Sequence, residues 1–168
     1  SRDAIGAGIY LRHVWGNTVP AFYDKPQENH TAYAYTFVWS PKKQTVGLWV
    51  TTQDYSRSES DLPPPQGEWD YRKSRIYLND TAITPPRWEN NHTKKSNEIT
   101  LKNENFTARP PLPVTLKKGW NKVFLKLPVG KFSTPEVRLQ KWMFAFLFVT
   151  PDGSERAEGL VYSPDRIR

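Results

Sequence analysis

The chain has 168 residues, a formal net charge of +7 and no cysteine. This length fits one domain with a full core and is too short for a (β/α)8 barrel, which typically has ~250 residues. The lack of cysteine excludes disulfides, thiol catalysis and cysteine-ligated zinc, and no apolar run reaches the ~18 residues of a membrane-spanning helix.

The positive charge is spread along the chain in short groups such as Lys42-Lys43 and Lys117-Lys118. No group approaches the ~5–6 like charges of an interaction tail. This pattern favours a solvated surface over a nucleic-acid footprint, so we expect no nucleic-acid partner. A basic face that docks onto an acidic neighbouring domain is the other interpretation.

Aromatic residues make up 14 % of the chain and there are 15 prolines, a composition that favours β-structure. Strand-forming runs recur at close to the ~8–12-residue spacing of sandwiches and barrels. Long connections at 17–29, 54–73 and 85–96 interrupt them, and loops of that length are usually functional or packed against something. The predicted strands are residues 5–14, 31–39, 44–52, 74–79, 97–101, 114–116, 120–127, 139–150 and 160–162.

Two of these strands indicate stacked sheets. In 120–127, Val123, Leu125 and Leu127 fall on one side of the strand. Lys122 and Lys126 fall on the other, a period-2 pattern typical of a half-buried strand. In 139–150 both alternate sets are apolar, and only a strand covered on both sides tolerates that pattern. We therefore expect 139–150 to be central in its sheet.

An aromatic stripe runs along 31–39, where Tyr33, Tyr35, Phe37 and Trp39 share one face. Stripes of this kind are usually buried, and we expect the same of the strand residues Trp39, Trp49, Trp120 and Trp142. If the stripe were exposed, it would form a flat surface for glycans. The turn residues of 40–44 predict a tight hairpin, and similar turn chemistry occurs at 79–81 and 151–153.

The chain lacks the common catalytic motifs, including a phosphate loop, a nucleophile elbow and a His-Glu-x-x-His sequence. The three histidines lie far apart, and we expect no metal site and no cofactor. An enzymatic alternative would require Glu68 and Asp70 to converge with another acid. A structural calcium could use Asp54, Glu68 and Asp70, but their spacing is not diagnostic.

Aromatic residues in the long connections are the positive functional signal. Sugar rings have an apolar C–H face that stacks on Trp or Tyr, and hydroxyls that need polar partners. The run 66–72 combines both kinds of residue. An alternative is that these aromatics cap the sandwich or pack against a neighbouring domain. The candidate carbohydrate-binding residues are Trp15, Trp69, Tyr71 and Trp88 for stacking, with Asp54, Arg57 and Asp70 for hydroxyls.

Four segments carry a family resemblance and together cover most of the chain: GIYLRHVWG (8–16), HTAYAYTFVWSPKKQTVGLWV (30–50), LPPPQGEWDYRKSRIYLND (62–80) and LKKGWNKVFLKLPVGKF (116–132). In these segments the chain resembles the C-terminal module of family 20 glycoside hydrolases, the β-N-acetylhexosaminidases of gut-type Bacteroidetes. The resemblance implies an all-β fold: a two-sheet antiparallel jelly-roll sandwich, similar to galactose-binding domains, spanning 1–168 as a C-terminal fragment of a longer enzyme.

The same resemblance implies a function. In that family an Asp-Glu pair in a separate barrel performs catalysis, and this chain has no Asp-Glu dipeptide. We therefore expect a non-catalytic accessory module of a periplasmic, cell-surface or secreted bacterial enzyme, with any signal upstream. Its expected partners are glycans with N-acetylhexosamine and the catalytic domain of the same chain. The alternative is a structural module that packs against the barrel and has no ligand.

Overall fold

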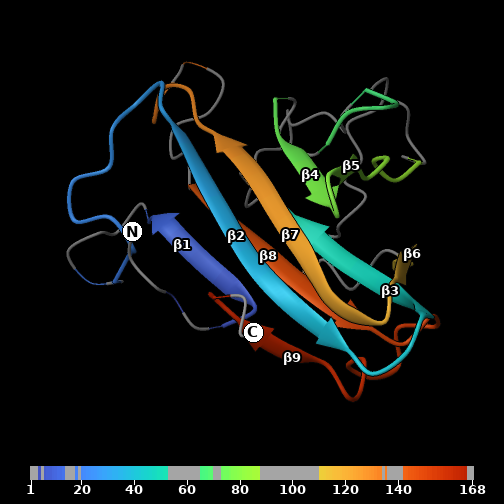
Figure 1. The fold of residues 1–168 in the computed structure, drawn as a ribbon. Helices are drawn as coiled ribbons and strands as arrows, with labels where there is room; N and C mark the ends of the chain where they lie inside the picture. The colour runs from blue at the N-terminus through green and yellow to red at the C-terminus, as the bar shows by residue number, and fades with distance from the viewer. Residues whose placement is uncertain are drawn as a thin grey trace.

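The computed structural model describes residues 4, 6–13, 18, 20–52, 65–69, 73–87, 110–133, 135 and 142–165. Within these residues there is no helix, and the strands form two antiparallel sheets. Figure 1 shows two layers, with β2 (Thr31–Ser40) and β7 (Gly119–Pro128) crossing in front of β8 (Trp142–Val149). The predicted all-β sandwich is confirmed.

One sheet has five strands in the order β5-β4-β7-β2-β9, and the other has four in the order β1-β8-β3-β6. The strands not yet given bounds are β1 (Gly8–Arg12), β3 (Gln44–Thr51), β4 (Arg75–Leu78), β5 (Thr81–Ala82), β6 (Leu112–Leu116) and β9 (Val161–Ser163). The finer prediction, a jelly roll of the galactose-binding-like type, stays a prediction.

The core lies between the inner faces of the two sheets. Val123, Leu125 and Leu127 of β7 are buried there, as their alternation predicts. The four-stranded sheet contributes Val46, Leu48 and Val50 of β3 and the phenylalanines of β8 to the same core. Trp142 at the start of β8 joins this core, and its indole N–H donates a hydrogen bond to the carbonyl oxygen of Leu127 at 3.2 Å.

Every predicted strand that falls within the described residues is confirmed, with ends that differ by at most three residues. The predicted strand 97–101 lies outside them. Strand β8 has β1 on one side and β3 on the other, so its predicted interior position is confirmed. The predicted turn at 79–81 joins β4 to β5, and both Asn79 and Asp80 have positive φ, as a type I′ hairpin turn requires.

The predicted hairpin at 40–44 is wrong. This turn is tight, but it connects β2 of the five-stranded sheet to β3 of the four-stranded sheet, and the two strands do not pair. Each strand has its partners elsewhere: β2 pairs with β7 along its whole length and with β9, and β3 pairs with β8 and β6. The local turn chemistry indicated a reversal but carried no information on which sheet the chain enters next.

Asn121, near the start of β7, links several backbone segments of the five-stranded sheet through hydrogen bonds. Its side chain is fully buried, and the amide donates to the carbonyl oxygens of Lys117, Gly119 and Val38. Its oxygen accepts hydrogen bonds from the backbone N–H of Lys117 and from the side chain of Asn79, at 2.9 and 2.8 Å. One buried amide thus ties the turn before β7 to β2 and to the β4–β5 hairpin.

Candidate ligand-binding face

The outer face of the five-stranded sheet carries a row of aromatic side chains in water. Tyr33 is 60 % exposed, Tyr35 53 % and Trp39 36 %, while Phe37 between them is half-buried. All four come from alternate positions of β2, which places them on one face. They project away from the core, because Ala32 and Val38 from the intervening positions are buried on the opposite face.

The sequence-based expectation that this stripe is buried is therefore wrong. The small residues of β2 face the other sheet, and the bulky ones face solvent. Of the four strand tryptophans predicted to be core, Trp142 is buried, Trp49 and Trp120 are half-buried, and Trp39 is exposed.

Neighbouring strands extend the row into a wider surface. The register of β2 with β7 puts Tyr35 opposite Phe124 and Trp39 opposite Trp120, and Phe124 in turn lies opposite Tyr77 of β4. Cross-strand partners share a face of the sheet. We call the resulting surface the aromatic face; it consists of Tyr33, Tyr35, Phe37 and Trp39 of β2, Trp120 and Phe124 of β7, and Tyr77 of β4.

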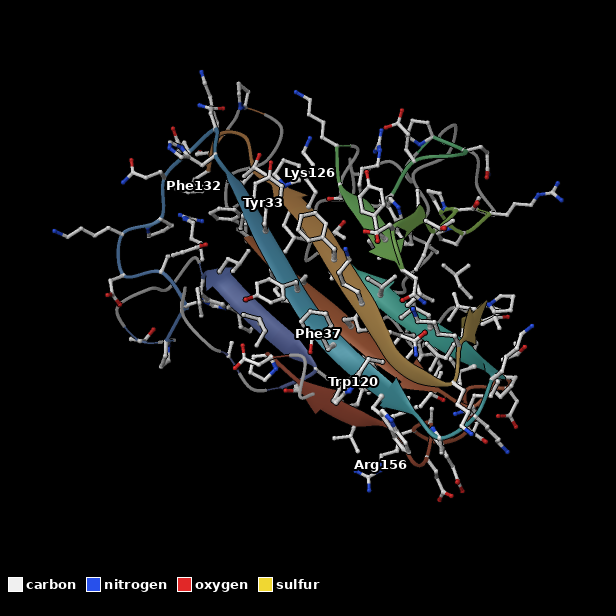
Figure 2. All side chains as sticks on the ribbon, in the orientation of Figure 1. Tyr33, Phe37, Trp120, Lys126, Phe132 and Arg156 are labelled. Atoms are coloured by element: carbon white, nitrogen blue, oxygen red, sulfur yellow. The ribbon has the colours of Figure 1, made fainter. Side chains whose placement is uncertain are left out.

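Ring contacts hold part of the aromatic face in place. Tyr33 stacks on Phe124 with centroids 5.6 Å apart, and Tyr77 lies 6.1 Å from the same ring on its other side. Tyr35 meets Phe37 edge to face at 6.3 Å. Figure 2 shows Tyr33 near one end of the face, Trp120 near the other and Phe37 between them. Paired rings of this kind are positioned before any ligand arrives.

Cations alternate with the rings. Lys126 lies opposite Tyr33 on one side and Arg75 on the other, so these three form one row across β2, β7 and β4. Lys122 lies opposite Phe37, and its ammonium pairs with the carboxylate of Asp80 in the β4–β5 turn. The face therefore combines flat apolar rings with hydrogen-bond donors that carry positive charge.

This combination suits a planar ligand with polar edges. Contiguous apolar patches are uncommon on monomeric proteins, and they usually mark interaction sites. Leaving a ring such as Phe in water forgoes about 1.5–3 kcal/mol of stabilisation that burial would give. Successive rings on β2 lie ~7 Å apart along the strand, so the row of four spans ~20 Å. That length accommodates more than one sugar ring.

The structure places only one of the seven predicted carbohydrate-binding residues. Trp69 is 1 % exposed and belongs to the core, where it lies beside Leu48, Val50 and Leu112. A ring in this position has no face open to a sugar, so the predicted stacking role of Trp69 is wrong. The other six, Trp15, Asp54, Arg57, Asp70, Tyr71 and Trp88, lie outside the described residues, and their roles stay predictions.

A groove of about 580 Å³ opens at one edge of the sandwich, between the β4–β5 segment and β6. Its walls are largely apolar, with Leu78, Ile83, Pro86 and Val114 among them. The side chain of Asn79 also borders it, but both of its polar atoms are engaged with Asn121 and Lys122. Arg87 and the threonines Thr81, Thr84 and Thr115 also line the groove, but no exposed aromatic ring of the described residues does.

Within the described part of the chain, no three His, Asp or Glu side chains converge as metal ligands would. Asp54 and Asp70, two of the three residues considered for calcium, lie outside it. No helix among the described residues has the length and apolar character to cross a membrane.

The aromatic face could be found in part from the sequence. The stripe on β2 is visible as a pattern, and the lysines of β7 indicate a solvent-facing side. What the sequence lacks is the register that puts Tyr33 opposite Lys126 and Tyr35 opposite Phe124. Pairing β2 with β7 would have shown that the stripe shares the solvent face with lysines.

Comparisons with protein-family models, with curated proteins and with solved structures found no match to this chain. The resemblance to the accessory modules of family 20 glycoside hydrolases therefore rests on the four sequence segments and stays a prediction.

Proposed function

We propose that this chain is a non-catalytic carbohydrate-binding module and that the aromatic face is its binding surface. The observation that carries the proposal is the exposure of Tyr33, Tyr35 and Trp39 in one row. Their rings present flat apolar surfaces to which the C–H faces of pyranose rings can stack. Lys126 and Arg75 flank the row, where they can donate hydrogen bonds to sugar hydroxyls.

The wider biological setting follows from the sequence resemblance and is part of the same proposal. The module would belong to a secreted, cell-surface or periplasmic bacterial β-N-acetylhexosaminidase and would hold glycans near its catalytic barrel. Few rings and few hydrogen bonds contribute, so we expect dissociation constants in the range of roughly millimolar to micromolar.

The test is calorimetry of the isolated domain with soluble N-acetylglucosamine oligomers, supported by a glycan array. Tyr35→Ala and Trp39→Ala should each weaken binding about tenfold or more, because each removes a stacking surface worth ~1.4 kcal/mol. Tyr10→Ala serves as the matched control, since Tyr10 lies in the four-stranded sheet. A wild-type domain that binds no saccharide at millimolar concentration would refute the proposal.

A structural role is the second candidate, and the exposed apolar side chains of this sheet favour it. An open sheet surface with Val161 also exposed beside Trp39 suits a protein partner as well as a glycan. In that case the domain binds no sugar. The substitutions Tyr35→Ala and Trp39→Ala then weaken its association with the separately produced catalytic domain, again measured by calorimetry.

A further inference from the structure

Among the described residues, positively charged side chains outnumber negatively charged ones on and beside the aromatic face. Its described strands contribute three cations, Arg75, Lys122 and Lys126, and among the described residues the carboxylate of Asp80 in the β4–β5 turn pairs with Lys122. The whole chain carries a formal charge of +7, but here the positive groups stand directly beside stacking rings. A ligand on this face therefore meets positive potential close to its ring plane.

The two lysines of β7 are in different electrostatic states. Lys122 is paired with Asp80, so its charge is largely neutralised. Lys126 is half-buried, and no carboxylate in the described part of the chain forms an ion pair with it. It stands two residues from Phe124 on the same face and directly opposite Tyr33, two rings that stack on each other. Figure 2 shows Tyr33 and Lys126 at the same end of the sheet.

The Lys126 ammonium, which no described carboxylate pairs with, can donate a hydrogen bond to a hydroxyl of a neutral sugar, but it forms a stronger, charge-assisted hydrogen bond with an anionic substituent. Partial burial strengthens that bond, because water screens it less than at a fully exposed site. Arg75 lies opposite Lys126, on the side away from Tyr33, and places a second positive charge in the same row.

From this arrangement we infer that the aromatic face selects an acidic glycan, whose ring stacks on Tyr33 and Phe124 while its carboxylate or sulfate group pairs with Lys126. The inference rests on the proposed carbohydrate-binding function and adds the class of ligand. A uronic acid and a sulfated sugar supply the same chemistry, an anion attached to a pyranose ring, so the experiment must separate the two sources.

The experiment compares matched glycans by calorimetry on the isolated domain. Hyaluronan fragments are measured against their carboxyl-reduced form, and chondroitin sulfate fragments against desulfated chondroitin. Chitin oligomers serve as a neutral N-acetylglucosamine ligand. The variants are Lys126→Gln, the conservative Lys126→Arg and the control Lys42→Gln. Lys42 is exposed in the β2–β3 turn, so Lys42→Gln makes the same change of charge away from the aromatic face.

The wild-type domain should bind one of the two acidic glycans about tenfold more tightly than the counterpart from which the carboxylate or the sulfate has been removed, as expected for one charge-assisted contact. Lys126→Gln should abolish that preference, and it should weaken chitin-oligomer binding less than it weakens binding of the acidic glycan. Lys126→Arg should retain the preference, and Lys42→Gln should have no effect. Which pair shows the preference identifies carboxylate or sulfate as the anion.

Equal affinity within both glycan pairs would overturn the inference and leave the proposed function intact. An equal loss in Lys42→Gln and Lys126→Gln would also overturn it, because it would show non-specific attraction to the net charge. A wild-type domain that binds none of these saccharides would instead refute the proposed function itself.

Discussion

Trp39 and Trp69 carry the same ring in opposite surroundings. Trp39 projects from the outer face of β2 and is 36 % exposed, whereas Trp69 is 1 % exposed and packs beside β3 and β6. Nothing in the residue itself distinguishes the two. Trp39 sits in a strand, where a buried ring is expected, and Trp69 sits in a polar run that indicates a loop. At the residue scale, the sequence-based prediction put Trp39 in the core and Trp69 at a binding surface, and the structure has the reverse.

This difference predicts unequal losses of stability. Trp69→Ala should lower the free energy of unfolding by about 3–5 kcal/mol, the range for truncating a buried aromatic. Trp39→Ala should cost about 1 kcal/mol or less, as at an exposed position. Urea denaturation followed by circular dichroism measures both. Similar losses in the two variants would contradict the burial of Trp69 or the exposure of Trp39.

Asp152 gives a prediction on pH. Its carboxylate accepts hydrogen bonds from the hydroxyl of Thr150 and from the backbone N–H and hydroxyl of Ser154, and these bonds lower its pKa to about 2. A depressed folded-state pKa stabilises the fold above the ordinary value of 3.8, and the contribution is lost as pH falls through about 2. An NMR titration of the carboxyl carbon should show this pKa.

The variant Thr150→Val removes the largest of these contributions, so the pKa of Asp152 should rise toward 3.8. The acid-induced loss of stability that belongs to this turn should become smaller in the same variant. A pKa close to 3.8 in the wild-type protein would show that the turn does not hold the ionised carboxylate in solution.

At the scale of elements, periodicity located the strands because the inner positions of this sandwich are consistently apolar. The alternation of Val123, Leu125 and Leu127 marked β7, and the double apolar pattern marked β8 as an interior strand. Pairing was harder to foresee. The turn at 40–44 has the residues of a hairpin, yet its strands separate into different sheets, because pairing depends on partners far away in the chain.

Two turns with glycines in the left-handed region allow a controlled comparison. Gly153, after β8, has φ +76°, and a Cβ there would lie 2.7 Å from Cζ2 of Trp49. Gly119, the first residue of β7 after the turn from β6, has φ +88° and no atom within 4 Å of such a Cβ. Gly119→Ala should cost about 1–2 kcal/mol from backbone strain alone. Gly153→Ala should cost about 1–3 kcal/mol more, because the steric clash is added.

Thermal unfolding of the two glycine variants, followed at several scan rates, checks that order. A Gly153→Ala variant as stable as Gly119→Ala would mean that Trp49 moves away without loss, and that the turn does not pack tightly on β3.

At the scale of the whole molecule, the four-stranded sheet covers the inner face of the five-stranded sheet, and the outer face of the five-stranded sheet carries the aromatic face. The four-stranded sheet and the inner residues of β2, β4 and β7 form the core, which frees the outer face of the five-stranded sheet to carry rings and cations. Pattern and composition predicted the β-sandwich, but the site was predicted in the loops. The aromatic face combines residues of three strands, so it could not be predicted without the register that pairs them.

The most direct test of the aromatic face is an NMR titration of the domain with hyaluronan fragments and with N-acetylglucosamine oligomers, read at the tryptophan indole N–H signals. The signals of Trp39 and Trp120 should shift and saturate with ligand, while those of the buried Trp69 and Trp142 should stay in place. Shifts confined to Trp15 or Trp88, or no shift at millimolar ligand, would contradict the assignment of this face as the binding surface.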